Sequence, residues 1–284
     1  MDPKKEIKFV TYNVWSREDV VLYKRMQAIS DLVYKHSPDV IFFQEILPYI
    51  LKIFQSSIWW KHYHSSPISQ EQQKEKNFCM MLSKIPLENY ACWKFATTAS
   101  GKSYLEAGIN PSPGSATMKP ICIATTQLEC PCPPEPMHCM ERYTQAEHAI
   151  AALSSAENVV FDGDMSWDDD RDLPFPLPDG WADASPHDSW TYDGLWNEKL
   201  GEFGGAYRAS HKSLQRRSNR FVCKMNDYKR SSIITIGDQE VGFKMYGYEY
   251  NYKRKYPNCD YDKLVLMPSC HRGLVLTLVP NEDA

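Results

Sequence analysis

The stretch at residues 158–167, N-V-V-F-D-G-D-M-S-W, constrains the fold more than any other part of the chain. A short apolar run leads directly into two acids, Asp162 and Asp164, that one glycine separates. An acid at the end of a buried strand costs free energy to bury, so it indicates a function or a specific set of partners. Three further polar runs stand beside apolar stretches, at residues 11–13, 43–45 and 269–271. We therefore expect a scaffold that brings four strand ends together.

Hydrophobic periodicity predicts the elements that carry these runs. Residues 7–14 alternate and contain many β-forming side chains, which predicts a first strand. In residues 19–36, Leu22, Met26, Ile29 and Val33 recur at steps of four, three and four, which predicts an amphipathic helix. Residues 39–43 are too apolar for a half-exposed strand, so we expect a central strand with both faces covered.

The rest of the chain continues this outline. Helices are predicted at residues 48–56 and 141–153, and strands at 78–82, 91–96, 121–128, 159–161, 220–225, 233–236 and 274–279. Residues 100–114 contain glycine and proline and show no period, so we expect a loop there. These elements predict a single α/β domain over residues 1–284, with two sheets packed face to face and helices outside.

Composition limits the possible partners. The formal net charge of −4 gives no global attraction to nucleic acid, so any phosphate binding must come from a local patch. No run approaches the roughly 18 apolar residues of a membrane span, and the N-terminal residues lack the apolar core of a signal peptide. We expect a monomer that does not enter a membrane.

The cysteines predict a reducing compartment, the nucleus or the cytoplasm. There are nine, an odd number, and Cys79, Cys122 and Cys223 lie in apolar runs that are typical of reduced core residues. One other group, Cys130, Cys132, His138 and Cys139, has ligand types that could hold a structural zinc ion. Its spacing is not that of a CxxC pair, so metal analysis of the purified protein must decide whether this group binds zinc.

Four polar residues near the expected strand ends have the chemistry of a phosphate-processing site. Glu45 is a hard oxygen ligand suited to Mg²⁺, and Asp164 is a candidate base. His271 can donate to a developing phosphate charge, and the amide of Asn13 can orient a ligand or a water. Taken singly, each has a structural explanation such as a turn or a helix cap. Their joint occurrence at four strand ends favours a site.

The order of several motifs adds a resemblance to a known family. They read F-V-T-Y-N-V-W at 9–15, R-E-D at 17–19, H-S-P-D at 36–39, F-Q-E at 43–45, L-E-C-P-C-P at 128–133, G-D-M at 163–165, F-P-L-P-D at 175–179, T-Y-D at 191–193 and H-R-G-L at 271–274. Over about residues 7–280 the chain resembles the endonuclease/exonuclease/phosphatase superfamily. Within it, the chain is similar to the 5′-tyrosyl-DNA phosphodiesterase (tyrosyl-DNA phosphodiesterase 2) type, in its plant form.

This resemblance implies a four-layer α/β sandwich and hydrolysis, with Mg²⁺ or Mn²⁺, of the bond between a DNA 5′ phosphate and a tyrosine. That reaction releases trapped topoisomerase II in DNA repair. The roles it implies are metal positioning by Asn13 and Glu45, orientation and activation of the attacking water by Asp164, and stabilisation of the phosphate by His271.

Four positions depart from the family pattern at places where the family does chemistry. Gln127 stands where the family has a phosphate-binding histidine, and Ser166 stands where it has an asparagine that shares water orientation. Cys270 replaces an aspartate beside His271, and Asn219 replaces the aspartate that partners that histidine. These losses predict a catalytically weak or inactive pseudoenzyme, because removing one transition-state donor costs about 10²–10³ in rate. Asp162 replaces a family glycine and adds a charge near Asp164.

A degenerate site can still bind DNA 5′ ends or 5′-phosphotyrosyl DNA. His211, Lys212, Arg216, Arg217 and Arg220 form a basic stretch in an otherwise acidic chain, and a solvated loop is its structural alternative. Aromatic side chains that could stack on a base are Tyr192 and Trp196.

Three alternatives to a pseudoenzyme remain. The first is an active metal-dependent phosphodiesterase with an atypical site, the second is a protein-interaction module without DNA binding, and the third is an enzyme with a cysteine nucleophile. The candidate surfaces for a protein partner are Trp59 with Trp60, residues 246–261 and the Cys/Pro loop. A cysteine nucleophile at Cys270 is disfavoured because neighbours on a strand, here Cys270 and His271, point to opposite faces.

Overall fold

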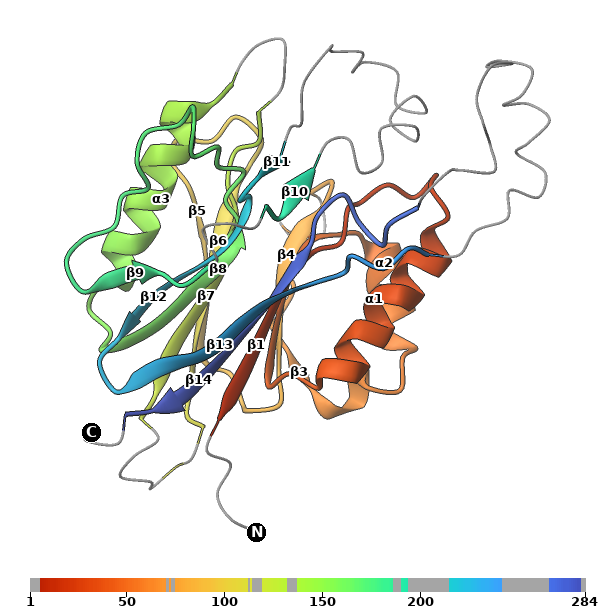
Figure 1. The fold of residues 1–284 in the computed structure, drawn as a ribbon, viewed down its shortest axis with the longest axis horizontal. Helices are drawn as coiled ribbons and strands as arrows, with labels where there is room; N and C mark the ends of the chain where they lie inside the picture. The colour runs from red at the N-terminus through yellow and green to blue at the C-terminus, as the bar shows by residue number, and fades with distance from the viewer. Residues whose placement is uncertain are drawn as a thin grey trace.

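The computed structural model describes residues 6–69, 72, 75–111, 113, 119–131, 137–185, 190–193, 215–241 and 266–281. Within these residues, two six-stranded sheets stack face to face (Figure 1). The first contains β1 (Ile7–Asn13), β2 (Val40–Ile46), β3 (His64–Ser65), β4 (Phe78–Ser83), β13 (Tyr228–Ile236) and β14 (Gly273–Pro280). The second contains β5 (Glu88–Lys94), β6 (Ser103–Ile109), β7 (Ile121–Gln127), β8 (Asn158–Asp164), β9 (Trp181–Asp183) and β12 (Asn219–Met225).

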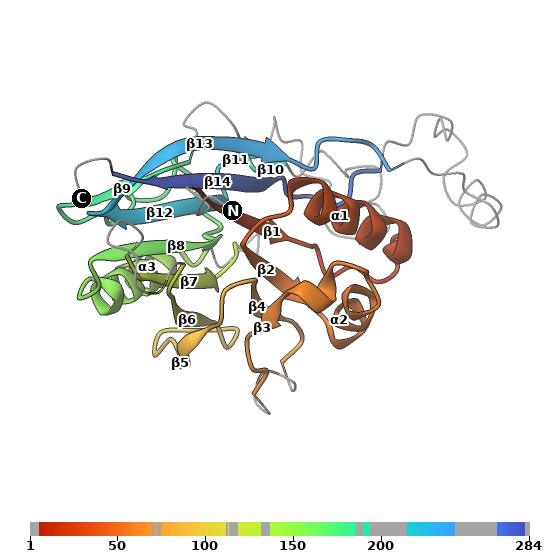
Figure 2. The same cartoon turned by 90° about the horizontal axis from the view of Figure 1, so that it is seen from below.

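The helices lie outside this pair of sheets. Figure 2 shows α1 (Leu22–His36) and α2 (Pro48–Gln55) against the first sheet and α3 (Cys139–Leu153) against the second. A short 3₁₀ helix, η1 (Trp60–His62), follows α2, and β10 (Tyr192–Asp193) pairs with β11 (Gln215–Arg216) in a small ribbon. The architecture is the expected four-layer α/β sandwich.

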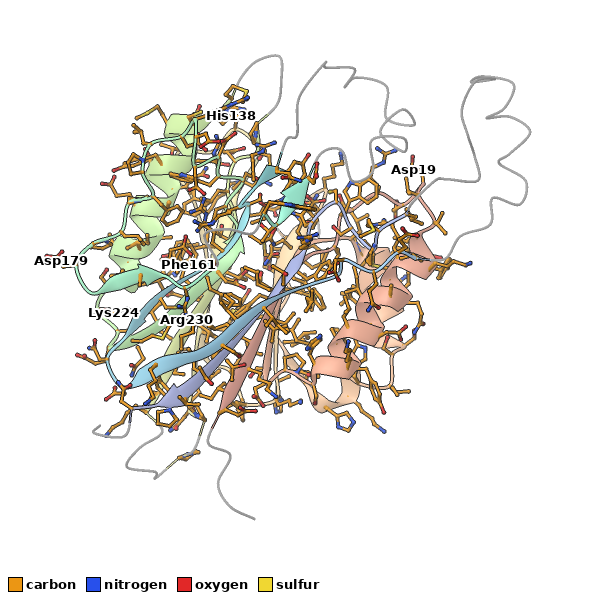
Figure 3. The ribbon with its side chains drawn as sticks, viewed as in Figure 1. Asp19, His138, Phe161, Asp179, Lys224 and Arg230 are labelled. Atoms are coloured by element: carbon orange, nitrogen blue, oxygen red, sulfur yellow. The ribbon has the colours of Figure 1, made fainter. Side chains whose placement is uncertain are left out.

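Three apolar layers hold the four structural layers together. Between the sheets, Phe9, Phe42 and Phe221 pack in one cluster. A second cluster lies between the first sheet and α1 and α2, and it includes the four residues predicted for the buried helix face. A third lies between the second sheet and α3, where Phe161 is fully buried. In Figure 3, Phe161 lies in the interior, whereas Asp179 lies at the outer edge.

Strand order explains why the polar strand ends meet. In the first sheet the order is β13-β14-β1-β2-β4-β3, and β1 and β2 are parallel. In the second the order is β5-β6-β7-β8-β12-β9, and β7 and β8 are parallel. The carboxyl ends of each parallel pair lie at one edge of their sheet, and β8 contacts both β1 and β2 across the sandwich. The buried strand predicted at residues 39–43 corresponds to the first part of β2, which begins at Val40.

Two sequence predictions need correction. Residues 100–114 were expected to form a loop, but Ser103–Ile109 is β6, which pairs with β5 and β7. Leu105, Ala107 and Ile109 face the other sheet, and this alternation was obscured by the small residues and glycines around it. The first helix begins at Leu22 and not at residue 19, because Val21 has a left-handed conformation with φ 40°.

No helix among the described residues is long and apolar enough to cross a membrane. The described cysteines are all free.

Candidate active site

The site lies where the carboxyl ends of four strands converge. Asn13 ends β1, Glu45 lies near the end of β2, Gln127 ends β7 and Asp164 ends β8. The side-chain amide of Asn13 connects the two sheets, since its Nδ2 atom donates to Glu45 Oε1 at 3.0 Å and to Asp164 Oδ2 at 2.8 Å. The convergence expected from the strand-end motifs is therefore present for Asn13, Glu45 and Asp164, whereas Gln127 was not among those motifs and His271 precedes β14 (Gly273–Pro280).

Unusual backbone conformations place the site residues. Glu45 has φ 61° at an irregularity in the pairing of β2 with β4, and Ser166 has φ 49°. A left-handed conformation is uncommon for residues other than glycine and recurs at functional sites. Gly163 has φ 145°, and a Cβ atom there would lie 2.0 Å from the carbonyl oxygen of Thr126. Only glycine fits between the two acids at this close approach of β7 and β8.

Glu45 is saturated by hydrogen bonds. Its Oε2 atom accepts from the backbone nitrogen and from the hydroxyl of Ser16, both at 2.9 Å. Its Oε1 atom accepts from Asn13 and, at 2.9 Å, from Nε2 of Gln127. Burial acts to raise the pKa of Glu45, but the Ser16 bond, attraction to His271 and the Asn13 bond lower it below its usual value. Glu45 is therefore charged at neutral pH.

Asp164 is buried and also charged. Its Oδ1 atom accepts from Ser218 Oγ at 2.5 Å and from the backbone nitrogen of Ser166 at 2.9 Å. Burial acts to raise the pKa of Asp164, but attraction to His271 and the bonds from Ser218, Ser166 and Asn13 lower it to about 2. The hydroxyl of Ser166 lies 3.2 Å from Oδ1, so Ser166 binds the aspartate itself.

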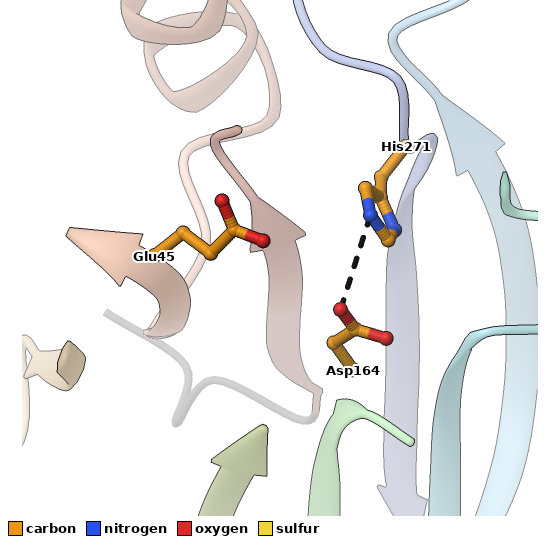
Figure 4. Close-up of side chains that lie close together, drawn as sticks. All are labelled: Glu45, Asp164 and His271. Atoms are coloured by element: carbon orange, nitrogen blue, oxygen red, sulfur yellow. Dashed lines mark ion pairs between the residues drawn. The ribbon is translucent and has the colours of Figure 1, made fainter. Parts of the chain in front are cut away.

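His271 closes the site from the other side of Asp164. Its Nε2 atom lies 3.8 Å from Asp164 Oδ2, as the dashed line in Figure 4 marks, and Glu45 points toward the same space. Its Nδ1 atom lies 2.8 Å from Oδ1 of Asn219. Burial lowers the pKa of His271, against the opposing effect of Asp164 and Glu45. The imidazole is therefore neutral at neutral pH.

Gln127, like Asn13, contacts both carboxylates. Its Nε2 atom donates to Glu45 Oε1 and, at 3.3 Å, to Asp164 Oδ2. Its Oε1 atom accepts from Nζ of Lys102 at 2.8 Å. The amide thus connects a lysine to the carboxylate pair.

The model of the Endonuclease/Exonuclease/phosphatase family matches residues 10–161, which is over half of the chain and includes Asn13, Glu45 and Gln127. The chain belongs to the endonuclease/exonuclease/phosphatase family. The expectation from the sequence motifs is confirmed at this level.

Within the family, the chain is similar to tyrosyl-DNA phosphodiesterase 2. It is 25% identical over 204 residues to the Xenopus laevis protein of that name and 24% identical over 204 residues to the Xenopus tropicalis protein. Each alignment covers 68% of this chain and 51% of the relative, so the chain spans about half the length of the curated relatives it matches.

Solved structures confirm the fold of the family. D. rerio TDP2, crystallised with a single-strand DNA product, superimposes with a TM-score of 0.70 at 16% identity, covering 96% of this chain and 98% of that one. The human Nocturnin catalytic domain, with a bound sulfate anion, gives a TM-score of 0.62 at 13% identity, covering 98% and 94%. At such identities the likeness shows the fold alone.

This cluster of side chains has the donor set of a divalent-cation site. One ligand atom from each of Glu45, Asp164 and His271 lies within 4.8 Å of the others. Among the described residues, these three form the one group of acidic, histidine or cysteine side chains that could hold a metal ion. The two charged carboxylates suit Mg²⁺ or Mn²⁺ in kind. The amide hydrogens of Asn13 and Gln127 compete for the same carboxylate oxygens.

Cys270 adds no charge to this site. Cys270 is half-buried, and desolvation of its thiol, followed by the nearby charge of Glu45, raises its pKa well above the ordinary value. A neutral thiol is neither a nucleophile nor a ligand that Mg²⁺ favours.

The predicted DNA-binding residues divide into two groups. Tyr192 lies 4.9 Å from the ring of His271, and the guanidinium of Arg216 lies 5.0 Å from the ring of Tyr192. Arg217 and Arg220 instead form ion pairs with Asp169 and Asp183. A role of these two arginines in DNA binding stays a prediction.

Some earlier predictions fall outside the described residues. These are Trp196, His211, Lys212, Cys132 and the segment 246–261. Zinc binding at the Cys130 group therefore stays a prediction, and within the described part Ser166 Oγ lies 3.1 Å from Cys130 Sγ.

Sequence reasoning missed three residues that contact the site, namely Ser16, Lys102 and Ser218. Ser16 and Ser218 are close in sequence to Asn13 and Asn219. Closeness in sequence to a candidate residue is only a weak indication that a serine contacts the site. Lys102 lies in the segment expected to be a loop. Its signal appears only once Tyr104 is seen to pair with Thr126, which brings residue 102 alongside the end of β7.

Proposed function

We propose that this chain binds the 5′ phosphate end of DNA at the site of Asn13, Glu45, Asp164 and His271, and hydrolyses phosphotyrosyl ends weakly or not at all. The substrate class is supported by the sequence similarity to tyrosyl-DNA phosphodiesterase 2. It is also supported by the shared fold with D. rerio TDP2, which was crystallised with a single-strand DNA product.

The weak activity rests on one observation, the contact between His271 and Asn219. With the amide oxygen of Asn219 at 2.8 Å, Nδ1 is the protonated nitrogen of the neutral imidazole. Nε2 then carries a lone pair and cannot donate a hydrogen bond to a phosphate oxygen. An amide also lacks the charge that would stabilise the imidazolium, and burial lowers the pKa of His271 further.

The replacement at position 127 also weakens stabilisation of the phosphate in the transition state. Gln127 is a neutral donor where the family has a histidine, and charge-assisted hydrogen bonds are about twice as strong as neutral ones. The two effects belong to one catalytic unit, so they need not multiply. A divalent cation held by Glu45 and Asp164 would supply positive charge beside the phosphate.

Two measurements test this function. Fluorescence anisotropy should show tighter binding of a 5′-phosphorylated single strand than of its 5′-hydroxyl counterpart, and the affinity should fall steeply with salt. Turnover of a 5′-phosphotyrosyl oligonucleotide with Mg²⁺ or Mn²⁺ should be at least about 10²-fold below that of a family member with all partners intact. Full turnover that Asp164→Asn abolishes would overturn the proposal, as would equal binding of the two strands.

An active phosphodiesterase with an atypical site is the second candidate. One observation favours it: Glu45 and Asp164 both remain charged in the folded protein, with pKa values lowered by their partners. The turnover assay decides between the two candidates. Absence of any DNA binding would point to a protein-interaction module.

A further inference from the structure

Gln127 lies between a lysine and the two carboxylates of the site. Its side chain is 5% exposed at the end of β7. The Lys102 ammonium donates to Oε1 at 2.8 Å, and Nε2 donates onward to Glu45 and Asp164. Lys102 and Gln127 also line a cleft of about 270 Å³ with Lys76, Asn77 and Ser103.

This chain of contacts fixes which way the Gln127 amide points. An ammonium group has donors and no acceptor, so it pairs with the oxygen end of the amide only. A flipped amide would put its NH₂ group against Lys102 and its oxygen against two carboxylates. Both contacts would be repulsive, and the side chain is buried, so Lys102 selects the orientation seen here.

This orientation of the Gln127 amide disfavours the binding of a cation between Glu45 and Asp164. Glu45 Oε1 and Asp164 Oδ2 each accept from Asn13 Nδ2 and from Gln127 Nε2, so two amide donors meet the same two oxygens. A divalent cation between these oxygens needs lone pairs directed at it and would meet amide hydrogens from Gln127. An amide with its oxygen directed inward would instead be a suitable hard ligand.

We propose that Lys102, acting through Gln127, holds an amide donor on Glu45 and Asp164 and thereby weakens divalent-cation binding at this site. The proposal rests on the proposed function, in which this carboxylate pair is the cation site. Lys102 is a positioning residue here: it fixes Gln127 and does not itself contact the carboxylates through any described hydrogen bond.

The charge of Lys102 could weaken cation binding without any role of Gln127, so the test must separate the two effects. A double-mutant cycle does this. The four proteins are the wild type, Lys102→Met, Gln127→Met and the double variant. Methionine keeps the length of either side chain and removes its charge or amide. Mn²⁺ affinity is measured by isothermal titration calorimetry without DNA, after circular dichroism has shown that each variant is folded.

The expected result is a coupling between the two positions. Lys102→Met should tighten Mn²⁺ binding about tenfold in the Gln127 background, because the amide is then free to turn its oxygen inward. The same substitution should have less than about a threefold effect when residue 127 is methionine. Lys76→Met removes an exposed lysine from the same cleft and should leave the Mn²⁺ affinity unchanged.

Two outcomes would overturn the proposal. An equal gain from Lys102→Met in both backgrounds would assign the effect to charge alone. No gain in the Gln127 background, including a lack of measurable Mn²⁺ binding in every variant, would remove the role of Lys102 altogether. Binding of 5′-phosphorylated DNA in EDTA is a separate measurement, so failure of the proposed function can be told apart from failure of this inference.

Discussion

Oδ1 of Asn219 lies 2.8 Å from Nδ1 of His271, and this contact joins β12 to the segment that precedes β14. The Nδ2 atom of Asn219 has no hydrogen-bond partner among the described residues. The amide therefore serves the histidine with its oxygen alone. It holds the ring in place as a carboxylate would, but it contributes no charge.

Replacing Asn219 by aspartate should raise the pKa of His271. An aspartate at this distance favours the imidazolium, by about 1 unit or more for an opposite charge in direct contact. The pKa can be followed by NMR titration of the His271 ring nitrogens. Asn226→Asp, at an exposed position beyond the far end of β12, is the matched control and should leave the His271 pKa unchanged. An unchanged pKa in Asn219→Asp would contradict the electrostatic reading of this contact.

Introducing the two residues of the family pattern at positions 127 and 219 should increase turnover. The double variant Gln127→His with Asn219→Asp returns an imidazole beside the carboxylates and a charge behind His271. We expect turnover of a 5′-phosphotyrosyl oligonucleotide to rise about 10²-fold or more, since one transition-state donor contributes on that scale. Adding Asp164→Asn should remove the gain. A double variant no faster than the wild type would place the defect elsewhere, for instance at Ser166.

The sequence predicted the elements that hold the site because their patterns are unambiguous. The apolar run before Glu45 and the run before Asp162 are typical of strands covered on both faces, and both became central strands. The prediction failed at β6, where Glu106 and Gly108 interrupt the apolar side chains. In that segment tertiary pairing with β5 and β7 decides the structure, and local pattern does not.

The partners of the site residues were harder to predict than the residues themselves. Asp164 could be expected at the site from its own strand, whereas its bond to Ser218 spans 54 residues of sequence. Ser166 stands where the family pattern has an asparagine, and its left-handed backbone directs its hydroxyl onto Asp164. Such contacts depend on register and backbone turns, which composition and periodicity do not contain.

Asp162 should make stability depend on pH. It is fully buried beside Thr125 and Thr11, and burial raises its pKa well above the ordinary value. The folded protein therefore binds a proton that the unfolded chain releases above about pH 4. Stability is fully present below that unfolded pKa and falls as pH rises toward the folded pKa, by up to about 1.4 kcal/mol per pH unit.

Asp162→Asn removes this titration while keeping the size of the side chain. Urea unfolding should show the variant to be more stable than the wild type at about pH 8, with a smaller difference at about pH 5. Asp31→Asn, an exposed position on α1, controls for the general effect of losing one negative charge. A difference between Asp162→Asn and the wild type that does not change with pH would show that Asp162 is not protonated in the fold.

Arg216 and Arg217 should differ in their effect on DNA binding although they are adjacent. Arg216 stacks on Tyr192 beside His271, whereas Arg217 is paired with Asp183. Arg216→Ala should weaken binding of a 5′-phosphorylated single strand and reduce the salt slope by about 1, because one phosphate contact is lost. Arg217→Ala should lower the urea midpoint and leave the salt slope unchanged, since its partner is a carboxylate of the protein. Anisotropy titrations over a range of salt concentrations measure both slopes, and equal loss of slope in the two variants would show that the whole basic stretch contacts DNA.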